Sequence, residues 1–168
     1  MEVALFEPRI PQNTGNIARS CAAFNLPLNL IEPLGFKIED KYLRRAGLDY
    51  WPLVTVNKYE NFNKFLASKP TKRIISFSKK NGMYLKDFKF QENDVLLFGR
   101  EDSGLPNSII DKSDFLISIF MPNLQTSKND QKGVRSLNLS VACGIAIYEA
   151  HKQINFQNGD RKSTRLNS

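Results

Sequence analysis

Short apolar runs recur along the chain and alternate with helical patterns. The runs cover residues 3–6, 28–31, 53–56, 73–78, 94–98 and 115–121. Helical patterns occupy residues 17–24, 39–46, 59–66, 106–112 and 141–154. Strands that alternate with helices at this spacing are typical of an α/β fold. The sequence therefore predicts a mainly parallel sheet flanked by helices.

The last helical pattern, residues 141–154, is apolar on almost every side. A helix without a polar face is typically buried, so we expect the core to cover it, alone or together with a second subunit. In the residues before it, Ser136, Asn138 and Ser140 share one side of an extended backbone. Two interpretations fit this stretch: a loop whose free amides bind a polar ligand at the helix start, or a helix cap formed by Asn138 or Ser140.

A stretch with two prolines, residues 7–12, follows the first apolar run. Pro8 and Pro11 lack an amide hydrogen and restrict the backbone, so we expect an extended chain here. Residues 13–16, with the sequence Asn-Thr-Gly-Asn, have the chemistry of a turn and a helix cap. The sequence thus predicts a polar loop before the first helix.

Three polar loops that contain glycine follow predicted strands, at residues 13–16, 99–106 and 123–140. In parallel sheets, ligands bind beyond the carboxyl ends of the strands, so these loops should meet at a ligand site. Gly99 would let the backbone approach a ligand closely. Glu101 and Asp102 could accept hydrogen bonds from an amine or from ribose hydroxyl groups. The alternative for this acidic pair is a solvated turn.

Some classes of function are disfavoured by what the sequence lacks. It contains neither G-x-G-x-x-G nor the Walker motif G-x-x-x-x-G-K-[ST]. Its one histidine, His151, falls on the last helix, so histidine metal clusters and Ser-His or Cys-His catalysis are poorly supported, and we expect no metal. Cys21 and Cys143 have the pattern of small buried apolar residues.

The sequence pattern also bears on location and domain organisation. No apolar run approaches the roughly 20 residues that a membrane-spanning helix needs, so we expect no membrane association. Residues 1–8 have the pattern of a strand and not of a signal peptide. We expect one cytoplasmic domain over residues 1–156. Residues 157–168 lack apolar periodicity and are expected to form a disordered or non-native tail.

The formal net charge of +7 suggests a polyanionic partner. Asp160 and three basic residues of the tail account for +2, and the remaining +5 permits nucleic-acid binding without requiring it. Arg44 and Arg45 lie near Tyr50 and Trp51 in a basic and aromatic patch. Guanidinium groups pair with phosphates and aromatic rings stack on unpaired bases. The alternative is a solvated helix face beside a core tryptophan.

Several motifs occur together in a characteristic order. They are EP at 7–8, IPQNTGNIAR at 10–19, IEPLGF at 31–36, LRRAGLDY at 43–50, FG at 98–99 with Glu101, GLP at 104–106, RSLNLS at 135–140 and YEA at 148–150. With them the chain resembles the SPOUT-class RNA methyltransferases from about residue 3 to residue 154. Within this class it is most similar to small enzymes that methylate the wobble nucleotide of tRNA.

The resemblance implies a SPOUT α/β fold with a C-terminal trefoil knot, and a homodimer that binds the tRNA anticodon stem-loop across both subunits. It implies transfer of a methyl group from S-adenosyl-L-methionine to the ribose 2′ oxygen of nucleotide 34, a cytidine or uridine derivative. The alternatives are a 2′-O-methyltransferase of another RNA, such as rRNA, and a non-catalytic RNA-binding protein of the same fold.

The resemblance also assigns roles to individual residues. Arg19 would be the catalytic arginine, with Asn13 beside it. Because an arginine stays protonated and is a poor base, our hypothesis is that Arg19 binds a phosphate and orients the hydroxyl group, while Glu101 or a water receives the proton. Arg135 and Tyr148 would contact RNA or take part in catalysis, and the basic and aromatic patch makes Arg44 and Arg45 further candidates for RNA contact. The cofactor pocket would contain Phe77, Gly99, Glu101, Ile119, Met121, Ser136, Leu137 and Asn138.

Two features depart from the family pattern. The loop of residues 122–134 is longer than usual and carries Lys128 and Lys132, so it could change the RNA contacts or cover the cofactor. Arg100 occupies a position where close relatives often have proline.

Overall fold

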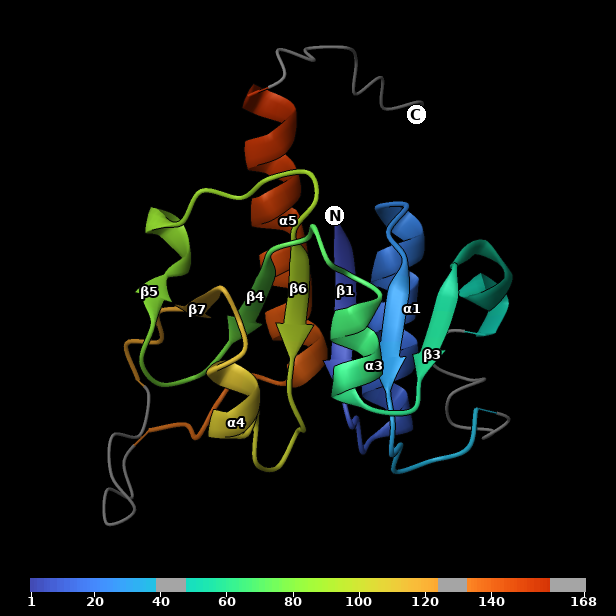
Figure 1. Cartoon of the computed structure of the whole chain (residues 1–168). Coiled ribbons are helices and arrows are strands. Elements are labelled where there is room, and N and C mark those ends of the chain that lie inside the picture. Colours follow the sequence, from blue (N-terminus) through green and yellow to red (C-terminus); the bar gives the residue numbers. More distant parts are fainter. Residues whose placement is uncertain (39–47, 124–132, 158–168) are drawn as a thin grey trace.

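The computed structural model describes residues 1–38, 48–123 and 133–157. In this part of the chain a seven-stranded sheet forms, with the order β3-β2-β1-β6-β4-β7-β5. Every pair of neighbouring strands is parallel. Figure 1 shows the sheet with helices on both sides. The prediction of a mainly parallel sheet flanked by helices is therefore confirmed.

The strands are short, and most helices lie between them in sequence. The strands are β1 (Glu2–Phe6), β2 (Leu28–Ile31), β3 (Val56–Tyr59), β4 (Ile74–Phe77), β5 (Met83–Tyr84), β6 (Val95–Phe98) and β7 (Phe115–Ser118). The α-helices are α1 (Pro11–Ala23), α3 (Phe62–Ala67), α4 (Asn107–Ile110) and α5 (Leu139–Gln157). The 3₁₀ helices are η1 (Leu48–Leu53) and η2 (Leu85–Asp87).

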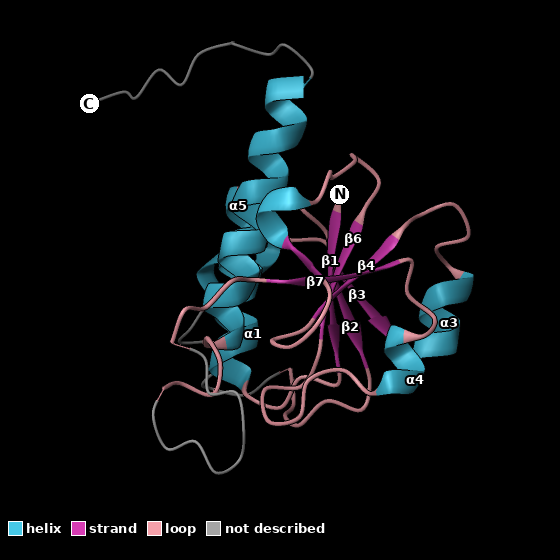
Figure 2. Ribbon diagram, turned by 90° about the vertical axis from the view of Figure 1, so that its left-hand side faces the viewer, coloured by secondary structure: helices cyan, strands magenta, loops and turns pink. Residues whose placement is uncertain are grey.

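The central strands are buried on both faces, and alternate residues contribute to two separate cores. In β1, Val3 and Leu5 belong to the core beneath α1 and α5. Ala4 and Phe6 belong to the core beneath α3 and α4. Figure 2 shows α1 and α5 on one side of the sheet and α3 and α4 on the other. The two-residue period of a strand thus explains why β1 is apolar throughout.

Two of the predicted elements, the third strand and the helix after it, were misplaced. The third strand was predicted at 53–56, but β3 begins at Val56, because an edge strand is partly exposed and its apolar pattern is weak. Tyr59, predicted to begin a helix, ends β3, and α3 begins at Phe62 after the cap Asn61. The predicted helix at 39–46 lies outside the described residues.

The loop predicted at residues 13–16 lies within the first two turns of α1, which begins at Pro11. Proline is tolerated at the first position of a helix, since the amide hydrogen there has no partner within the helix. Pro11 therefore starts the helix that it was expected to delay. Asn13, Thr14 and Gly15 are buried as a result.

Within the single chain, helix α5 is buried on one face only, so the core does not cover it alone, and the alternative of cover by a second subunit stays a prediction. Cys143, Ala146 and Ile147 are fully buried and belong to the same core as α1. Val141 and Ile145 are exposed on the other face. Among the described residues, α5 therefore presents an apolar surface to the outside of the chain.

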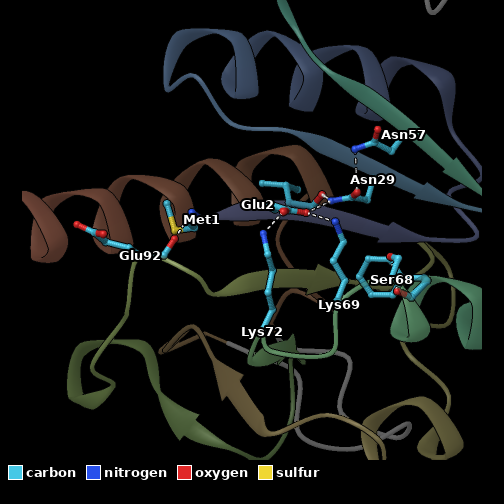
Figure 3. Close-up of polar contacts among 10 residues, drawn as sticks. Met1, Glu2, Asn29, Asn57, Ser68, Lys69, Lys72 and Glu92 are labelled. Carbon is cyan, nitrogen blue, oxygen red and sulfur yellow. Dashed lines mark hydrogen bonds and ion pairs between the residues drawn. The ribbon is translucent and has the colours of Figure 1, made fainter.

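A buried carboxylate lies at the amino end of β1. Glu2 is 7 % exposed and accepts hydrogen bonds from Asn29, Lys69 and Lys72. Figure 3 shows these side chains converging on Glu2 from β2 and from the segment after α3, and Asn57 of β3 extends the row through Asn29. This cluster joins three strands at the edge opposite the loops described next.

Strands β6, β4 and β7 are neighbours in the sheet although they are not consecutive in sequence. Because they are parallel, the segments that follow them leave the sheet at the same edge. These segments and the start of α5 form the candidate site.

Candidate functional site

A cavity of about 230 Å³ lies beyond the carboxyl ends of β4, β6 and β7. Its walls come from four segments far apart in sequence, namely the loops after these three strands and the start of α5. The lining residues are Phe77, Ser78, Lys79, Lys80, Phe98, Gly99, Arg100, Glu101, Asp102, Ser103, Gly104, Leu105, Ile119, Met121, Ser136, Leu137, Leu139 and Ala142. Ligands of parallel sheets bind at this position.

The loop after β6 is closed tightly upon itself. The Arg100 amide donates to the Gly104 carbonyl over 3.2 Å, and the Gly104 amide donates to the Arg100 carbonyl over 2.9 Å. A Cβ atom at Gly99 would lie 2.2 Å from the Gly104 carbonyl carbon. Glycine at position 99 is thus required by the fold of the cavity wall itself.

Arg100 holds this loop to the end of β1. Its Nε donates to the Glu7 carboxylate over 2.9 Å, and its guanidinium carbon lies 5.4 Å from the centre of the Phe6 ring. Here the loop is held by the Glu7 ion pair and by its two backbone hydrogen bonds.

The Glu101 carboxylate connects the cavity wall to the start of α1. Its oxygens accept hydrogen bonds from the amides of Arg9 (2.8 Å) and Ile10 (3.1 Å) and from Asn13 Nδ2 (3.2 Å). Asn13 Oδ1 in turn accepts a hydrogen bond of 3.0 Å from Asn138 Nδ2. A continuous polar chain therefore links β6, α1 and α5 behind the cavity.

Asn138 caps α5. Its Oδ1 accepts a hydrogen bond of 2.8 Å from the Ser140 amide and another of 2.7 Å from the Ser140 hydroxyl group. The helix-cap interpretation is therefore correct for Asn138. Ser136 and Leu137, just before the cap, line the cavity. The same stretch thus caps a helix and forms part of the candidate site.

The cavity has an apolar side and a polar side. Phe77 and Phe98 stack face to face with ring centres 4.6 Å apart, and Ile119 and Met121 continue the apolar lining. The loops after β4 and β6 supply the polar side. A ligand that combines a flat apolar ring with charged or hydroxyl groups fits such a lining.

The structure brings together all but one of the residues predicted for the pocket. Phe77, Gly99, Glu101, Ile119, Met121, Ser136 and Leu137 line the cavity, and Asn138 lies behind it as the cap. The sequence analysis did not identify the loop after β4, with Ser78, Lys79 and Lys80. The polar residues of 78–82, directly after an apolar strand, were the signal that could have revealed it.

Of the predicted catalytic and RNA-binding residues that the structure describes, Glu101 lines the cavity, whereas Arg19, Arg135 and Tyr148 do not. The Arg19 guanidinium carbon is 4.7 Å from the centre of the Tyr50 ring, on the side of α1 that faces η1. Arg135 and Tyr148 are exposed, and neither lines the cavity. Arg44 and Arg45 lie outside the described residues. Within the described chain, Asn13 and Glu101 alone of the predicted catalytic residues are close together.

The titratable groups give no sign of a nucleophile or a metal centre. Burial raises the pKa of the Cys21 thiol to about 12 and that of Cys143 well above its ordinary value, so both thiols are neutral. A hydrogen bond from Ser103 lowers the pKa of Asp102. The described residues contain no group of three or more His, Cys, Asp or Glu side chains that could hold a metal ion.

The fold and the site define a class of protein: a parallel α/β protein with a cavity for an organic ligand at the carboxyl ends of its strands. The family follows from comparison with known proteins. The chain belongs to the SpoU rRNA methylase family, whose model matches residues 1–148. The resemblance to SPOUT-class methyltransferases is thereby confirmed.

Individual relatives cover nearly the whole chain. The tRNA (cytidine(34)-2′-O)-methyltransferase of Saccharophagus degradans is 41% identical over 154 residues, which are 92% of this chain and 96% of the relative. The enzyme of the same name from Escherichia coli K12 is 38% identical over 156 residues, 93% and 95% of the two chains.

Solved structures share the fold. One, described as giving structural insights into the 2-OH methylation of C/U34 on tRNA, has 43% identity and a TM-score of 0.82, over 90% of this chain and 94% of the other. The methyltransferase AviRb from Streptomyces viridochromogenes, solved in complex with AdoMet, has a TM-score of 0.76 and 23% identity, over 91% and 60% of the two chains. At that identity the likeness shows the fold alone.

In the described residues no helix is long and apolar enough to cross a membrane.

Proposed function

We propose that this protein transfers a methyl group from S-adenosyl-L-methionine to the ribose 2′ oxygen of nucleotide 34, a cytidine or uridine derivative, in tRNA. The observation that carries the proposal is the cavity that the loops after β4, β6 and β7 form together with the start of α5. Two relatives that cover over nine tenths of the chain are named for this reaction, which supports the choice of substrate.

The cavity suits an adenosine derivative with a charged tail. Phe77, Ile119 and Met121 offer an apolar surface for the adenine ring, and the loop of 99–104 brings backbone groups close to the ligand. The close approach depends on Gly99, since a side chain there would push the loop outward. We assign Ser136 and Leu137 to the same pocket, and Asn138 to the positioning of both.

When bound, S-adenosyl-L-methionine would supply a methyl group for the ribose 2′ oxygen, with the bond from that methyl carbon to sulfur broken and the thioether S-adenosylhomocysteine as the leaving group. The contribution of the protein is then mainly to position the hydroxyl group in line with that methyl group. The Glu101 carboxylate already accepts hydrogen bonds from Arg9, Ile10 and Asn13. We therefore assign Glu101 and Asn13 to positioning, and water to removal of the hydroxyl proton.

Arg19 and the predicted RNA-binding residues complete the proposal on the RNA side. An arginine stays protonated and presents a planar set of donors, so Arg19 suits a phosphate beside the modified ribose and not the role of a base. We propose that Arg44, Arg45, Arg135 and Tyr148 contact the anticodon stem-loop. We also propose that the protein acts in the cytoplasm.

A homodimer is part of the proposal, because two observations on the single chain call for a partner. Arg19 does not line the cavity of its own chain. The exposed face of α5 carries Val141, Ile145 and Tyr148, which follow one another at helical spacing. We propose that a second copy covers this face of α5. The trefoil knot, which the family resemblance implies, also stays a proposal.

The test is a comparison of tRNA from cells with and without this protein, followed by reconstitution. Mass mapping of 2′-O-methyl groups should show loss of methylation at position 34 in the deficient cells. Purified protein with S-adenosyl-L-methionine should restore it. Intact methylation at position 34, or loss confined to rRNA, would contradict the proposal. Calorimetry without detectable binding of S-adenosyl-L-methionine would favour a non-catalytic RNA-binding protein.

A further inference from the structure

The loop after β4, residues 78–82, is held in a fixed shape at the cavity. The Ser78 hydroxyl accepts a hydrogen bond from the Lys80 amide over 3.2 Å and donates one to the Lys80 carbonyl over 2.6 Å. Asn81 and Gly82 both have positive φ angles, 63° and 95°. A Cβ atom at Gly82 would lie 2.5 Å from the Leu116 carbonyl oxygen, so the loop rests closely against β7.

This loop places two lysines together at the cavity. Lys79 and Lys80 both line it and both are exposed. Within the described part of the chain neither ammonium group has an ion pair or a hydrogen bond, whereas Arg100 on the loop after β6 is paired with Glu7. The two lysines therefore give the cavity rim two positive charges that no described group neutralises.

The loop after β6 brings an acidic side chain to the same cavity. Asp102 is exposed there, and the hydrogen bond from Ser103 lowers its pKa, so the carboxylate is ionised at neutral pH. An anion at the cavity mouth would be repelled from Asp102 and attracted towards Lys79 and Lys80. A polyanion at the opening is therefore favoured where its charges lie next to the two lysines and away from Asp102.

We propose that Lys79 and Lys80 bind the backbone phosphates of the RNA strand that enters the cavity, next to the nucleotide that is methylated. The inference rests on the proposed function and extends it to a contact that no motif indicated. Exposed ammonium groups on a fixed loop suit phosphates, which need charge without a particular base. Their position at the rim, outside the apolar wall, favours RNA over the cofactor carboxylate.

The test compares the double variant Lys79→Gln, Lys80→Gln with the charge-matched control Lys64→Gln, Lys89→Gln. The two control lysines are exposed and do not line the cavity. Binding of a tRNA anticodon stem-loop is measured over a range of salt concentrations, and binding of S-adenosyl-L-methionine by calorimetry. Thermal melts of the double variant and of the two single variants show whether a loss of RNA affinity is due to a loss of folded protein.

The site variant should bind RNA roughly ten-fold more weakly than the control. Its slope of log affinity against log salt should be smaller by about 0.7 for each phosphate that the variant no longer binds. Its affinity for S-adenosyl-L-methionine should be unchanged. The inference is overturned if site and control variants bind RNA equally, or if the site variant loses cofactor affinity and keeps its RNA affinity. If the wild-type protein neither binds nor methylates tRNA, that result would contradict the proposed function instead.

Discussion

At the scale of single residues, the candidate site depends on a few positions where only one residue type fits. Gly99 was predicted to allow a close approach to a ligand, and the structure adds a steric reason within the loop. A side chain there would collide with the backbone at Gly104, which closes the cavity wall. The same position thus serves the fold of the loop and the access of a ligand.

The substitution Gly99→Ala should distort the cavity wall and leave the rest of the fold intact. The added Cβ would lie 2.2 Å from a backbone carbon, so the loop of 99–104 must move. We expect at least a ten-fold loss of affinity for S-adenosyl-L-methionine, measured by calorimetry. The far-UV circular dichroism spectrum should stay close to that of the wild type. Retained affinity would show that the loop does not contact the cofactor.

At the scale of elements, the buried Glu2 cluster holds strands together at the edge opposite the cavity. Lys69 Nζ lies 2.6 Å from the Glu2 carboxylate, and both side chains are 9 % exposed. Hydrogen bonds from the two lysines and Asn29 outweigh burial and lower the Glu2 pKa from 4.5 to about 2. A buried pair of this kind becomes costly when one partner is removed.

This shift predicts a dependence of stability on pH. Because the Glu2 pKa is lower in the folded chain, the carboxylate stabilises the fold above pH 4.5, and this contribution is lost as pH falls towards 2. Glu2→Gln should therefore lower the free energy of unfolding by about 3 kcal/mol at pH 7, and by progressively less below pH 4.5.

Urea denaturation of the wild type and the variant between pH 7 and pH 3 measures this difference. The control is Glu60→Gln, which removes an exposed ion pair with Lys64 and should change stability by less than about 0.5 kcal/mol. Equal effects of the two substitutions at pH 7 would show that the Glu2 cluster contributes no more than a surface pair.

At the scale of the whole molecule, the outer face of α5 is apolar and exposed in the single chain. Val141, Ile145 and Tyr148 on α5 are 50 %, 39 % and 61 % exposed, while the opposite face of the helix packs against α1. A helix with two apolar faces is typical of burial on both sides. The proposed second subunit provides the missing side.

The substitution Ile145→Asp should convert the proposed dimer into a monomer. A carboxylate at this position would have to be buried without a partner in the interface, but would be solvated in the single chain. Analytical ultracentrifugation should show the wild type as a dimer and the variant as a monomer with an unchanged circular dichroism spectrum. A wild-type protein that sediments as a monomer at micromolar concentration would refute the dimer.

Local sequence determined the elements whose signals lie within a few residues. The buried strands β1, β2, β4 and β6 were predicted to within about a residue, because apolar side chains on both faces leave a continuous apolar run. The start of α1 and the edge strand β3 were misplaced. Proline at a helix start and a half-exposed strand both weaken the local pattern on which such predictions rest.

The candidate site shows what only the tertiary structure decided. The motifs named seven of the residues that line the cavity, but nothing local to Ser78, Lys79 and Lys80 indicated that they line the same cavity as Asp102. That neighbourhood arises because β4 lies between β6 and β7 in the sheet, an order set by long-range pairing. Similarly, the periodicity of α5 determined that the helix is apolar. Only packing against α1 decided which face remains open, because burial depends on partners distant in sequence.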